Sequence, residues 1–224
     1  MERMHERHSP AVEDYAKAIY TLQEQAEGPV TTTALAERLG VSAASASGMV
    51  RRFGEIGLAE HEPYKGVELT DAGRAVALEV IRHHRLIELL LADLGVPWDR
   101  VHDEAEVLEH HISEELEAVI AARLGDPTHD PHGDPIPAAD LTLDERPTVS
   151  LDQLQPGEGG RFVRVSDADP EMLRYLTGLG LAPGEMLELL RREPFEGPLI
   201  VGFGGQEHPL GVALGRAMRI EAAK

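Results

Sequence analysis

One stretch of the sequence, residues 31–54 (TTTALAERLGVSAASASGMVRRFG), restricts how the first part of the chain can fold more than any other. Thr33 or Thr32 can cap a short helix, and Gly40 permits a tight turn after it. Ser42 can then cap a second short helix whose apolar residues recur at helical spacing. Two short helices joined by a tight turn that contains glycine form the helix-turn-helix pattern, which we predict here.

The second predicted helix begins with a run of small side chains, residues 42–48 (SAASASG). A helix that enters the major groove of DNA, which is about 12 Å wide, needs such a slim first half. Residues 57–74 then read as strand, turn and strand, which predicts a β-wing with Lys65 near phosphate. The alternative is that the helical pair is a packing motif alone, and the wing argues against it. The candidate DNA contacts are Thr33, Ser42, Ala44, Ser45, Ser47, Arg51, Arg52 and Lys65.

The rest of the chain changes character twice. Residues 73–124 carry apolar positions at helical spacing, which predicts two long helices separated at GVPWD, and a loop rich in Pro, Gly, Asp and His follows at residues 125–137. From residue 148, short apolar stretches separated by glycines predict a small SH3-like β-barrel with one helical insertion. We therefore predict a mainly α chain with small β parts, in three domains. They are a winged helix-turn-helix (1–72), a helical domain with linker (73–147) and an SH3-like domain (148–224).

Composition limits the possible functions. The formal net charge of −19 opposes DNA binding, because affinity for DNA comes largely from neutralising phosphates. An uneven distribution of charge, or cations bound by the carboxylates, would reconcile the two. The sequence has no cysteine, which excludes disulfides and thiolate metal sites. Because no apolar run approaches the roughly 20 residues of a membrane span and no signal peptide is evident, we expect a cytoplasmic protein without a membrane partner.

Histidines and carboxylates recur at helical spacing in both predicted long helices. In the second helix, a residue set at i, i+4, i+7 and i+8 would share one helical face, and the first helix carries an i, i+4 pair. Such a face suits a divalent transition metal, although Glu and His on a helix are more often only solvated. The candidate ligands are His84, Glu88, His102, Glu106, Glu109 and His110. We expect the irregularly spaced His83, His111, His129 and His132 to be solvated.

These motifs together resemble the diphtheria toxin repressor family of iron- and manganese-dependent regulators. The matching stretches are EDYAKAIYTL (13–22), the helix-turn-helix, HHRLIELLL (83–91), VHDEAEVLEHHIS (101–113) and HGDPIP (132–137). The C-terminal region is similar to the FeoA-type, SH3-like domain of the longer members of that family. The resemblance implies a homodimer that binds palindromic double-stranded operator DNA in response to metal, as a repressor of metal uptake, with no organic cofactor and no enzymatic activity.

The resemblance also implies two metal sites. Its primary site would use Asp14 with Glu106, Glu109 and His110. Its ancillary site would use His84, Glu88 and His102, completed from the SH3-like domain. The positions that match there are Asp169 and Met172, and Glu171 is the nearer oxygen donor.

Departures from the family pattern bear on the choice of metal. Iron-type members have Met where this chain has Asp14, and Cys where it has Glu106, so hard oxygen replaces soft sulfur. We therefore expect Mn²⁺, with Fe²⁺ second, and with Co²⁺, Zn²⁺ or Cd²⁺ able to substitute in vitro, at about two ions per chain. Small manganese-type members have a further Glu where this chain has Lys17, and a lysine opposes a close two-metal cluster.

Two other functions stay open from the sequence alone. A winged-helix regulator could respond to a small organic effector, but only 4% of the residues are aromatic and the candidate ligand face is polar. A metal-dependent hydrolase could use the same carboxylate–imidazole set, but no nucleophile or general-base motif accompanies it.

Overall fold

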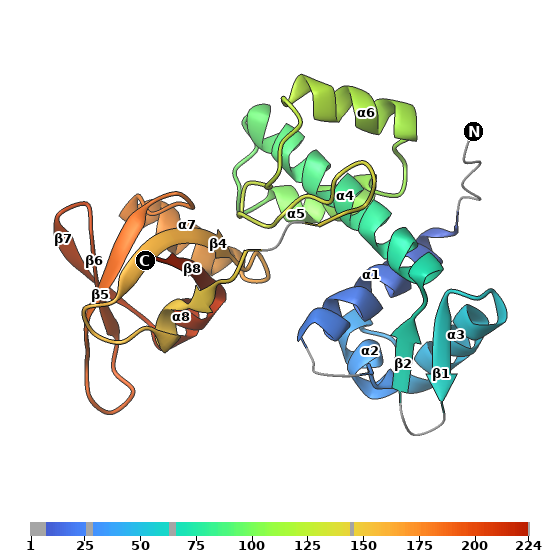
Figure 1. Ribbon diagram of the computed structural model, residues 1–224, viewed down its shortest axis with the longest axis horizontal. Helices are drawn as coiled ribbons and strands as arrows, with labels where there is room; N and C mark the ends of the chain where they lie inside the picture. Colours follow the sequence, from blue (N-terminus) through green and yellow to red (C-terminus); the bar gives the residue numbers. More distant parts are fainter. Residues whose placement is uncertain (1–7, 26–28, 63–65, 144–145, 224) are drawn as a thin grey trace. The chain divides into compact units, whose positions relative to one another are not determined.

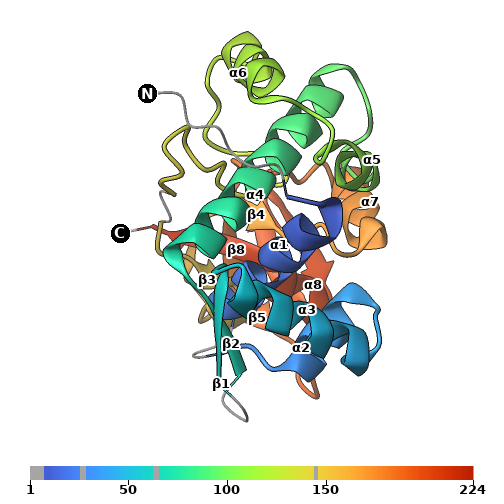
Figure 2. The ribbon, with the colours of Figure 1, turned by 90° about the vertical axis from the view of Figure 1, so that its right-hand side faces the viewer.

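The computed structural model describes residues 8–25, 29–62, 66–143 and 146–223. Its N-terminal part consists of α1 (Pro10–Gln25), α2 (Thr32–Leu39), α3 (Ala43–Glu55) and the antiparallel hairpin of β1 (Ala59–Glu62) and β2 (Gly66–Leu69) (Figure 1). Figure 2 shows α2, α3 and the hairpin from a second side. This order is that of a winged helix-turn-helix, as predicted.

Local capping explains where the two short helices begin and end. Thr31 Oγ1 accepts a hydrogen bond from the Ala34 N–H at 3.1 Å, so α2 is capped before the predicted Thr32 or Thr33. Gly40 ends α2 in the left-handed region with φ of 64°, and the Ser42 hydroxyl caps α3. The inward faces of both helices lie in one core with Phe53, which is fully buried.

The helical region contains α4 (Asp71–Asp93), α5 (Val101–Leu108) and α6 (Glu114–Arg123). The prediction of a second long helix is wrong, because that segment is divided into α5 and α6. Ser113 caps α6 by accepting from the Leu116 N–H, and acidic residues fill the first turn of α6. Both signals were present in the sequence SEELE. The prediction that four ligand candidates share one helical face is therefore also wrong, since α5 ends at Leu108.

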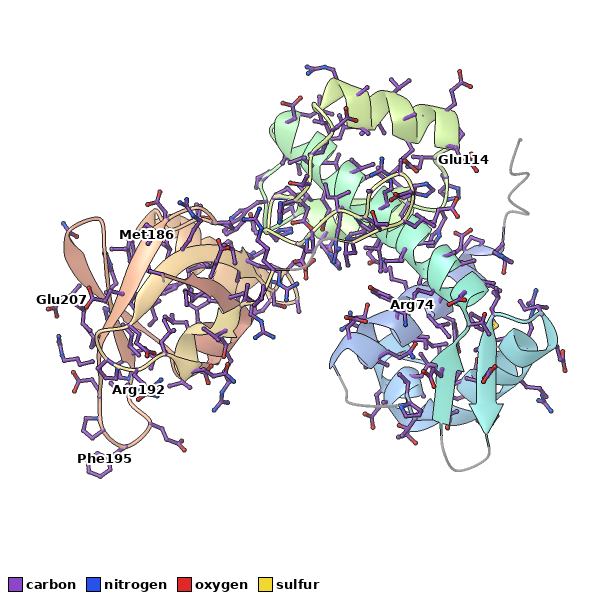
Figure 3. All side chains as sticks on the ribbon, in the orientation of Figure 1. Arg74, Glu114, Met186, Arg192, Phe195 and Glu207 are labelled. Carbon is purple, nitrogen blue, oxygen red and sulfur yellow. The ribbon has the colours of Figure 1, made fainter. Side chains whose placement is uncertain are left out.

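The C-terminal region forms an antiparallel sheet with the strand order β3-β8-β4-β5-β6-β7. Register shifts at Phe162–Arg164 and Leu189–Arg191 are the bulges that bend such a sheet toward a barrel. Figure 3 shows Phe195 at the tip of the loop between β5 and β6. The elements are β3 (Val149–Ser150), η1 (Leu151–Gln153), β4 (Gly159–Val165), α7 (Pro170–Leu179), β5 (Met186–Arg192), β6 (Leu199–Phe203), β7 (Gln206–Leu210), α8 (Val212–Ala217) and β8 (Met218–Ala222).

The chain divides into two compact units, and each is described by itself. The first contains the chain up to His83 with Glu109–Ile112 and Pro137–Thr142, and the second contains His84–Leu108, Ser113–Ile136 and the chain from Leu143 onward. The first unit has one apolar core; the second has a barrel core and a smaller cluster of α4, α6 and the following loop. Within the part of the chain that the structure describes, no helix has the length and apolar character to cross a bilayer.

The loop that contains HGDPIP packs directly on the barrel. The Val165 N–H donates to the His132 carbonyl at 3.0 Å. Gly133 has φ of 89°, and a Cβ there would lie 1.8 Å from the Val163 carbonyl oxygen. Only glycine allows this approach of two backbones.

We predict that Gly133→Ala lowers the thermal unfolding midpoint of the second unit. The cost should be about 2–4 kcal/mol, because the new methyl group adds a backbone clash to left-handed strain. Gly95→Ala is the matched control, since Gly95 has φ of 90° and nothing within 4 Å of its Cβ position. Its cost should stay near 1 kcal/mol. Equal shifts for the two variants in calorimetry would contradict the close approach.

Candidate metal centres and DNA-binding face

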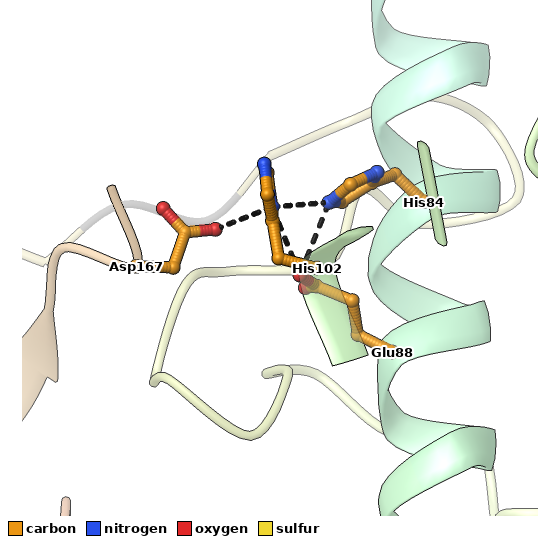
Figure 4. A group of neighbouring side chains, drawn as sticks. All are labelled: His84, Glu88, His102 and Asp167. Atoms are coloured by element: carbon orange, nitrogen blue, oxygen red, sulfur yellow. Dashed lines mark hydrogen bonds and ion pairs between the residues drawn. The ribbon is translucent and has the colours of Figure 1, made fainter. Parts of the chain in front are cut away.

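Four side chains from three parts of the second unit converge at one point (Figure 4). His84 and Glu88 lie one turn apart on α4, His102 lies on α5, and Asp167 lies between β4 and α7. His84 Nε2 is 3.1 Å from both Glu88 Oε1 and His102 Nδ1. His102 Nδ1 is also 2.9 Å from Asp167 Oδ2. We call this set the α4–α5 cluster.

The electrostatics of the α4–α5 cluster centre on a buried carboxylate. Glu88 is only 1% exposed. Burial would raise its pKa, but its histidine neighbours, His102 first, outweigh that and hold the pKa of Glu88 well below its usual range. The hydrogen bond to Asp167, and then that to Glu88, raise the pKa of His102 to about 10. The histidines of the cluster thus offset the charge of the buried Glu88 carboxylate.

A further histidine lies behind Glu88. His132 is fully buried, donates from Nε2 to the Trp98 carbonyl at 2.7 Å, and places Nδ1 3.8 Å from Glu88 Oε2. Burial would lower the pKa of His132, but the nearby Glu88 carboxylate raises it to about 9. The expectation that His132 is solvated is therefore wrong, and it is also wrong for the buried His83; His111 and His129 are exposed.

Asp167 occupies the place for which the sequence analysis selected Asp169 and Glu171. Asp169 is the N-cap of α7, and its carboxylate accepts from the Glu171 N–H at 2.9 Å. Met172 packs against the barrel core. Among the described residues, neither Asp169 nor Glu171 belongs to a group that could hold a metal. The capping role of Asp169 could have been identified from the sequence, because an Asp directly before a Pro at the first helical position is a typical helix N-cap.

The donor set of the α4–α5 cluster fits a divalent metal. Bonds of about 2.1 Å place adjacent ligand atoms about 3.0–3.4 Å apart in octahedral or tetrahedral coordination. The interatomic distances of 2.9–3.4 Å within the cluster match that spacing. Two imidazole nitrogens and two carboxylate oxygens, without sulfur, are a borderline-to-hard set.

A second group, which we call the α1 cluster, lies in the first unit. Asp14 on α1 meets Glu109 and His110, which follow α5 in the sequence. His110 Nε2 lies 2.9 Å from Asp14 Oδ1 and 3.5 Å from Glu109 Oε1. His110 Nδ1 donates to Glu13 Oε2 at 2.6 Å. Glu13, which the sequence analysis did not select, thus orients the ring so that Nε2 faces the other two ligand candidates.

Lys17 supplies the positive charge of the α1 cluster. Its Nζ donates to both carboxylate oxygens of Glu109, at 2.8 and 2.9 Å, and the Glu109 side chain is fully buried. Burial raises the pKa of Asp14, against the lowering influence of His110. Lys17 lies one helical turn after Asp14 on α1, and it faces the α1 cluster, as expected from the sequence.

The remaining ligand candidate, Glu106, belongs to the second unit. Its Oε1 is 3.7 Å from both His84 Nδ1 and His102 Nε2, and its side chain is 41% exposed. Its assignment to the same centre as Asp14 stays a prediction.

The candidate DNA contacts lie mainly on one surface of α3. Ala44, Ser45, Ser47, Arg51 and Arg52 are all exposed, and so is Thr33 on α2. The exposed Ser42 uses its hydroxyl to cap α3, accepting from the Ser45 N–H at 3.1 Å. Lys65 lies outside the described residues.

Comparisons with known proteins agree with this architecture. Three family models match in order: an iron-dependent repressor N-terminal DNA-binding domain at residues 8–67, an iron-dependent repressor metal-binding and dimerisation domain at 70–138, and a FeoA domain at 149–222. The diphtheria toxin repressor of Corynebacterium efficiens is 33% identical over 220 residues, covering 93% of this chain and 94% of the relative. The iron-dependent repressor IdeR of Mycobacterium tuberculosis is 32% identical over 222 residues, covering 93% and 96%.

Solved structures give the same result. A manganese-dependent transcriptional repressor in complex with manganese is 44% identical, with a TM-score of 0.88 and coverage of 95% of this chain and 100% of that one. ScaR with bound Zn²⁺ is 29% identical, with a TM-score of 0.79 and coverage of 95% and 99%. The relatives are DNA-binding repressors and not enzymes. With its three domains matched in order and nearly its whole length aligned, the chain belongs to the diphtheria toxin repressor family of metal-dependent transcriptional repressors.

Proposed function

We propose that this chain is a manganese-dependent repressor that controls genes of metal homeostasis, with Fe²⁺ as the second candidate metal. The observation that carries the proposal is the α1 cluster. It brings a carboxylate of the first helix of the DNA-binding domain against the Glu109–His110 pair of the metal-binding domain. Acting on chromosomal DNA, the protein would work in the cytoplasm.

The side chains of the α1 cluster would act by fixing α1. Asp14 and Glu109 are two carboxylates that repel each other, and Lys17 and His110 offset that repulsion only in part. A bound divalent cation would supply the positive charge that both carboxylates and His110 Nε2 bind together. Glu13 keeps Nε2 directed at that position, so α1 becomes ordered relative to residues 109–112. The family resemblance assigns Glu106 to this centre as well.

The α4–α5 cluster would be a second, ancillary metal site, giving about two ions per chain. It connects α4, α5 and the segment before α7, so a cation there would stabilise the attachment of the FeoA domain to the helical region. Neither cluster offers sulfur, which favours Mn²⁺ over softer metals. The relative ScaR has been solved with Zn²⁺ and with Cd²⁺, which supports substitution in vitro.

Exposed apolar side chains support a homodimer. Val107 and Leu108 on α5 are 64% and 40% exposed, and Leu116 and Val119 on α6 are 46% and 60% exposed. Large apolar residues grouped on a surface mark association sites, and the matching family model is a metal-binding and dimerisation domain. A two-fold dimer with one recognition helix per subunit would read a palindromic operator.

The first test is selection of duplexes from a random library with Mn²⁺ and, separately, with a chelator. We expect a palindromic sequence to be enriched with Mn²⁺ alone. Enrichment under both conditions would refute the metal switch, and enrichment under neither would refute DNA recognition. The selected duplex then serves for Asp14→Asn, which should remove most of the Mn²⁺-induced gain in affinity, about 10–100-fold. Glu24→Gln, an exposed carboxylate on the same helix, is the control and should keep that gain.

The carboxylate of the α4–α5 cluster can be identified with two matched variants. Asp167→Asn should weaken one class of Mn²⁺ site by about tenfold or more, because it replaces a charged ligand. Asp169→Asn should leave both sites unchanged, since Asn caps a helix as well as Asp does. Titration calorimetry separates the outcomes. A loss of affinity in Asp169→Asn with none in Asp167→Asn would return the assignment to the sequence-based choice.

Lys17 should lower the affinity of the α1 cluster for metal and restrict it to one ion. In Lys17→Gln, the buried Glu109 loses its counter-charge, which costs about 3–5 kcal/mol for a fully buried pair and less for this partly exposed one. We therefore expect a lower unfolding midpoint in chelator and a larger upward shift with Mn²⁺ than in the parent. Arg74→Gln, at an exposed ion pair, is the control and should leave the Mn²⁺ shift unaltered. An unchanged Mn²⁺ shift in Lys17→Gln would show that Lys17 does not compete with the metal.

A further inference from the structure

The turn between β5 and β6, residues 193–198 (EPFEGP), presents an aromatic side chain to solvent. Phe195 is 100% exposed (Figure 3). Phe195 and Glu196 both adopt left-handed backbone, with φ of 60° and 57°. The Glu193 N–H donates to the Pro198 carbonyl and the Gly197 N–H to the Pro194 carbonyl, each at 3.1 Å, which holds the turn in this shape. Left-handed backbone is uncommon in residues other than glycine, so these contacts must offset its cost. We call this turn the Phe195 tip.

A pocket of about 380 Å³ lies elsewhere on the same unit, between the barrel and the loop that contains Gly133. Its walls include the apolar Pro135, Val163 and Pro183. Three arginines line it, although the chain as a whole carries a net charge of −19. We call it the arginine pocket, and its cationic residues are Arg146, Arg161 and Arg164.

The arginines retain donors for a further partner. Arg146 is 3.7 Å from Glu221, Arg161 donates to the Gly184 carbonyl at 3.0 Å, and Arg164 donates to Asp134 at 3.3 Å. Each of these contacts uses one of the five N–H groups of a guanidinium. Apart from the arginines, the charged lining consists of Glu221, the buried Asp130 and His129.

The Phe195 tip and the arginine pocket are complementary in charge and character. The tip offers one aromatic ring flanked in the sequence by two carboxylates, Glu193 and Glu196, and the pocket combines apolar walls with guanidinium groups. Arg191 contacts Glu193 at 3.2 Å and offsets its charge, whereas Glu196 is exposed and provides the outer charge of the tip. Aromatic anchors combined with arginine–carboxylate pairs are typical of protein interfaces.

The tip cannot reach the pocket of its own chain. The pocket is lined by Pro183 and Gly184, just before β5 begins at Met186, whereas the tip follows the end of β5 at Arg192. A strand of seven residues spans about 23 Å at 3.3 Å per residue. Figure 3 shows Met186 and Phe195 at opposite ends of this hairpin. Any occupant that carries this tip must therefore be another molecule.

We propose that the Phe195 tip of one chain docks into the arginine pocket of a second copy. The two surfaces differ, so a single head-to-tail contact of this kind leaves one tip and one pocket of the pair free for further copies. It would therefore join separate homodimers to one another. With one aromatic anchor it forms a small interface and should be weak and sensitive to salt.

Sedimentation velocity over a range of protein concentrations at low salt tests the proposal. The parent should show species larger than the dimer, whose fraction rises with concentration and falls with added salt. Phe195→Ala, Glu196→Arg and Arg161→Glu should each remove these species and leave the dimer intact. Glu188→Arg is the matched control, because it makes the same charge change at an exposed position of β5 away from tip and pocket. It should associate as the parent does.

Mixing variants distinguishes this contact from nonspecific association. Glu196→Arg keeps an intact pocket and Arg161→Glu keeps an intact tip, so an equimolar mixture should restore the larger species that neither forms alone. Restoration would establish the head-to-tail pairing. Absence of larger species in the parent, persistence of them in the single variants, or failure of the mixture would each overturn the proposal. Mn²⁺ titration of every variant should match the parent, so a defect in metal binding cannot imitate these outcomes.

Discussion

Buried negative charge is the constraint on which the rest of this structure depends. Glu88 and Glu109 are each 1% exposed, and an isolated buried carboxylate is too costly to persist. The chain meets that cost with different cations at the two places. Histidines surround Glu88, and the ammonium group of Lys17 binds both oxygens of Glu109. Each arrangement connects segments that are distant in the sequence, so charge neutralisation and tertiary structure are coupled.

This coupling explains how a bound metal ion could change the position or order of a helix in such a chain. A cation bound by Asp14, Glu109 and His110 would add positive charge where Lys17 alone does not balance two carboxylates. The element that would respond is α1, which packs against the helix-turn-helix through Ile19 and Tyr15. Tyr15 packs near Phe53, with ring centroids 6.4 Å apart. Asp14 of the α1 cluster therefore directly precedes a residue of the core of the DNA-binding domain.

The sequence predicted what local patterns determine and missed what depends on distant contacts. The helix-turn-helix follows from caps and a glycine within 24 residues, 31–54, and it is present. The break before Ser113 and the cap at Asp169 are also local. Ligand spacing favoured one continuous helix over the first, and the family resemblance favoured a ligand at the second, so both capping signals were outweighed. By contrast, the pair of Lys17 with Glu109 joins residues 92 positions apart, and the burial of His132 depends on packing against Trp98 and Glu88. No local pattern determines either contact.

The net charge of −19 conflicts less with DNA binding once the charge is located along the chain. Residues 38–54, which include α3 except for its last residue, Glu55, contain Arg38, Arg51 and Arg52 and no carboxylate. Residues 99–117, by contrast, contain eight carboxylates: Asp99, Asp103, Glu104, Glu106, Glu109, Glu114, Glu115 and Glu117. The segment that carries the candidate DNA contacts of α3 is therefore locally basic, although the molecule as a whole is acidic. Repulsion between the DNA phosphates and the carboxylates elsewhere on the protein weakens nonspecific binding, which does not depend on the DNA sequence. Binding then requires the close contacts of a correctly placed α3, so the acidity of the chain favours discrimination between operator and bulk DNA.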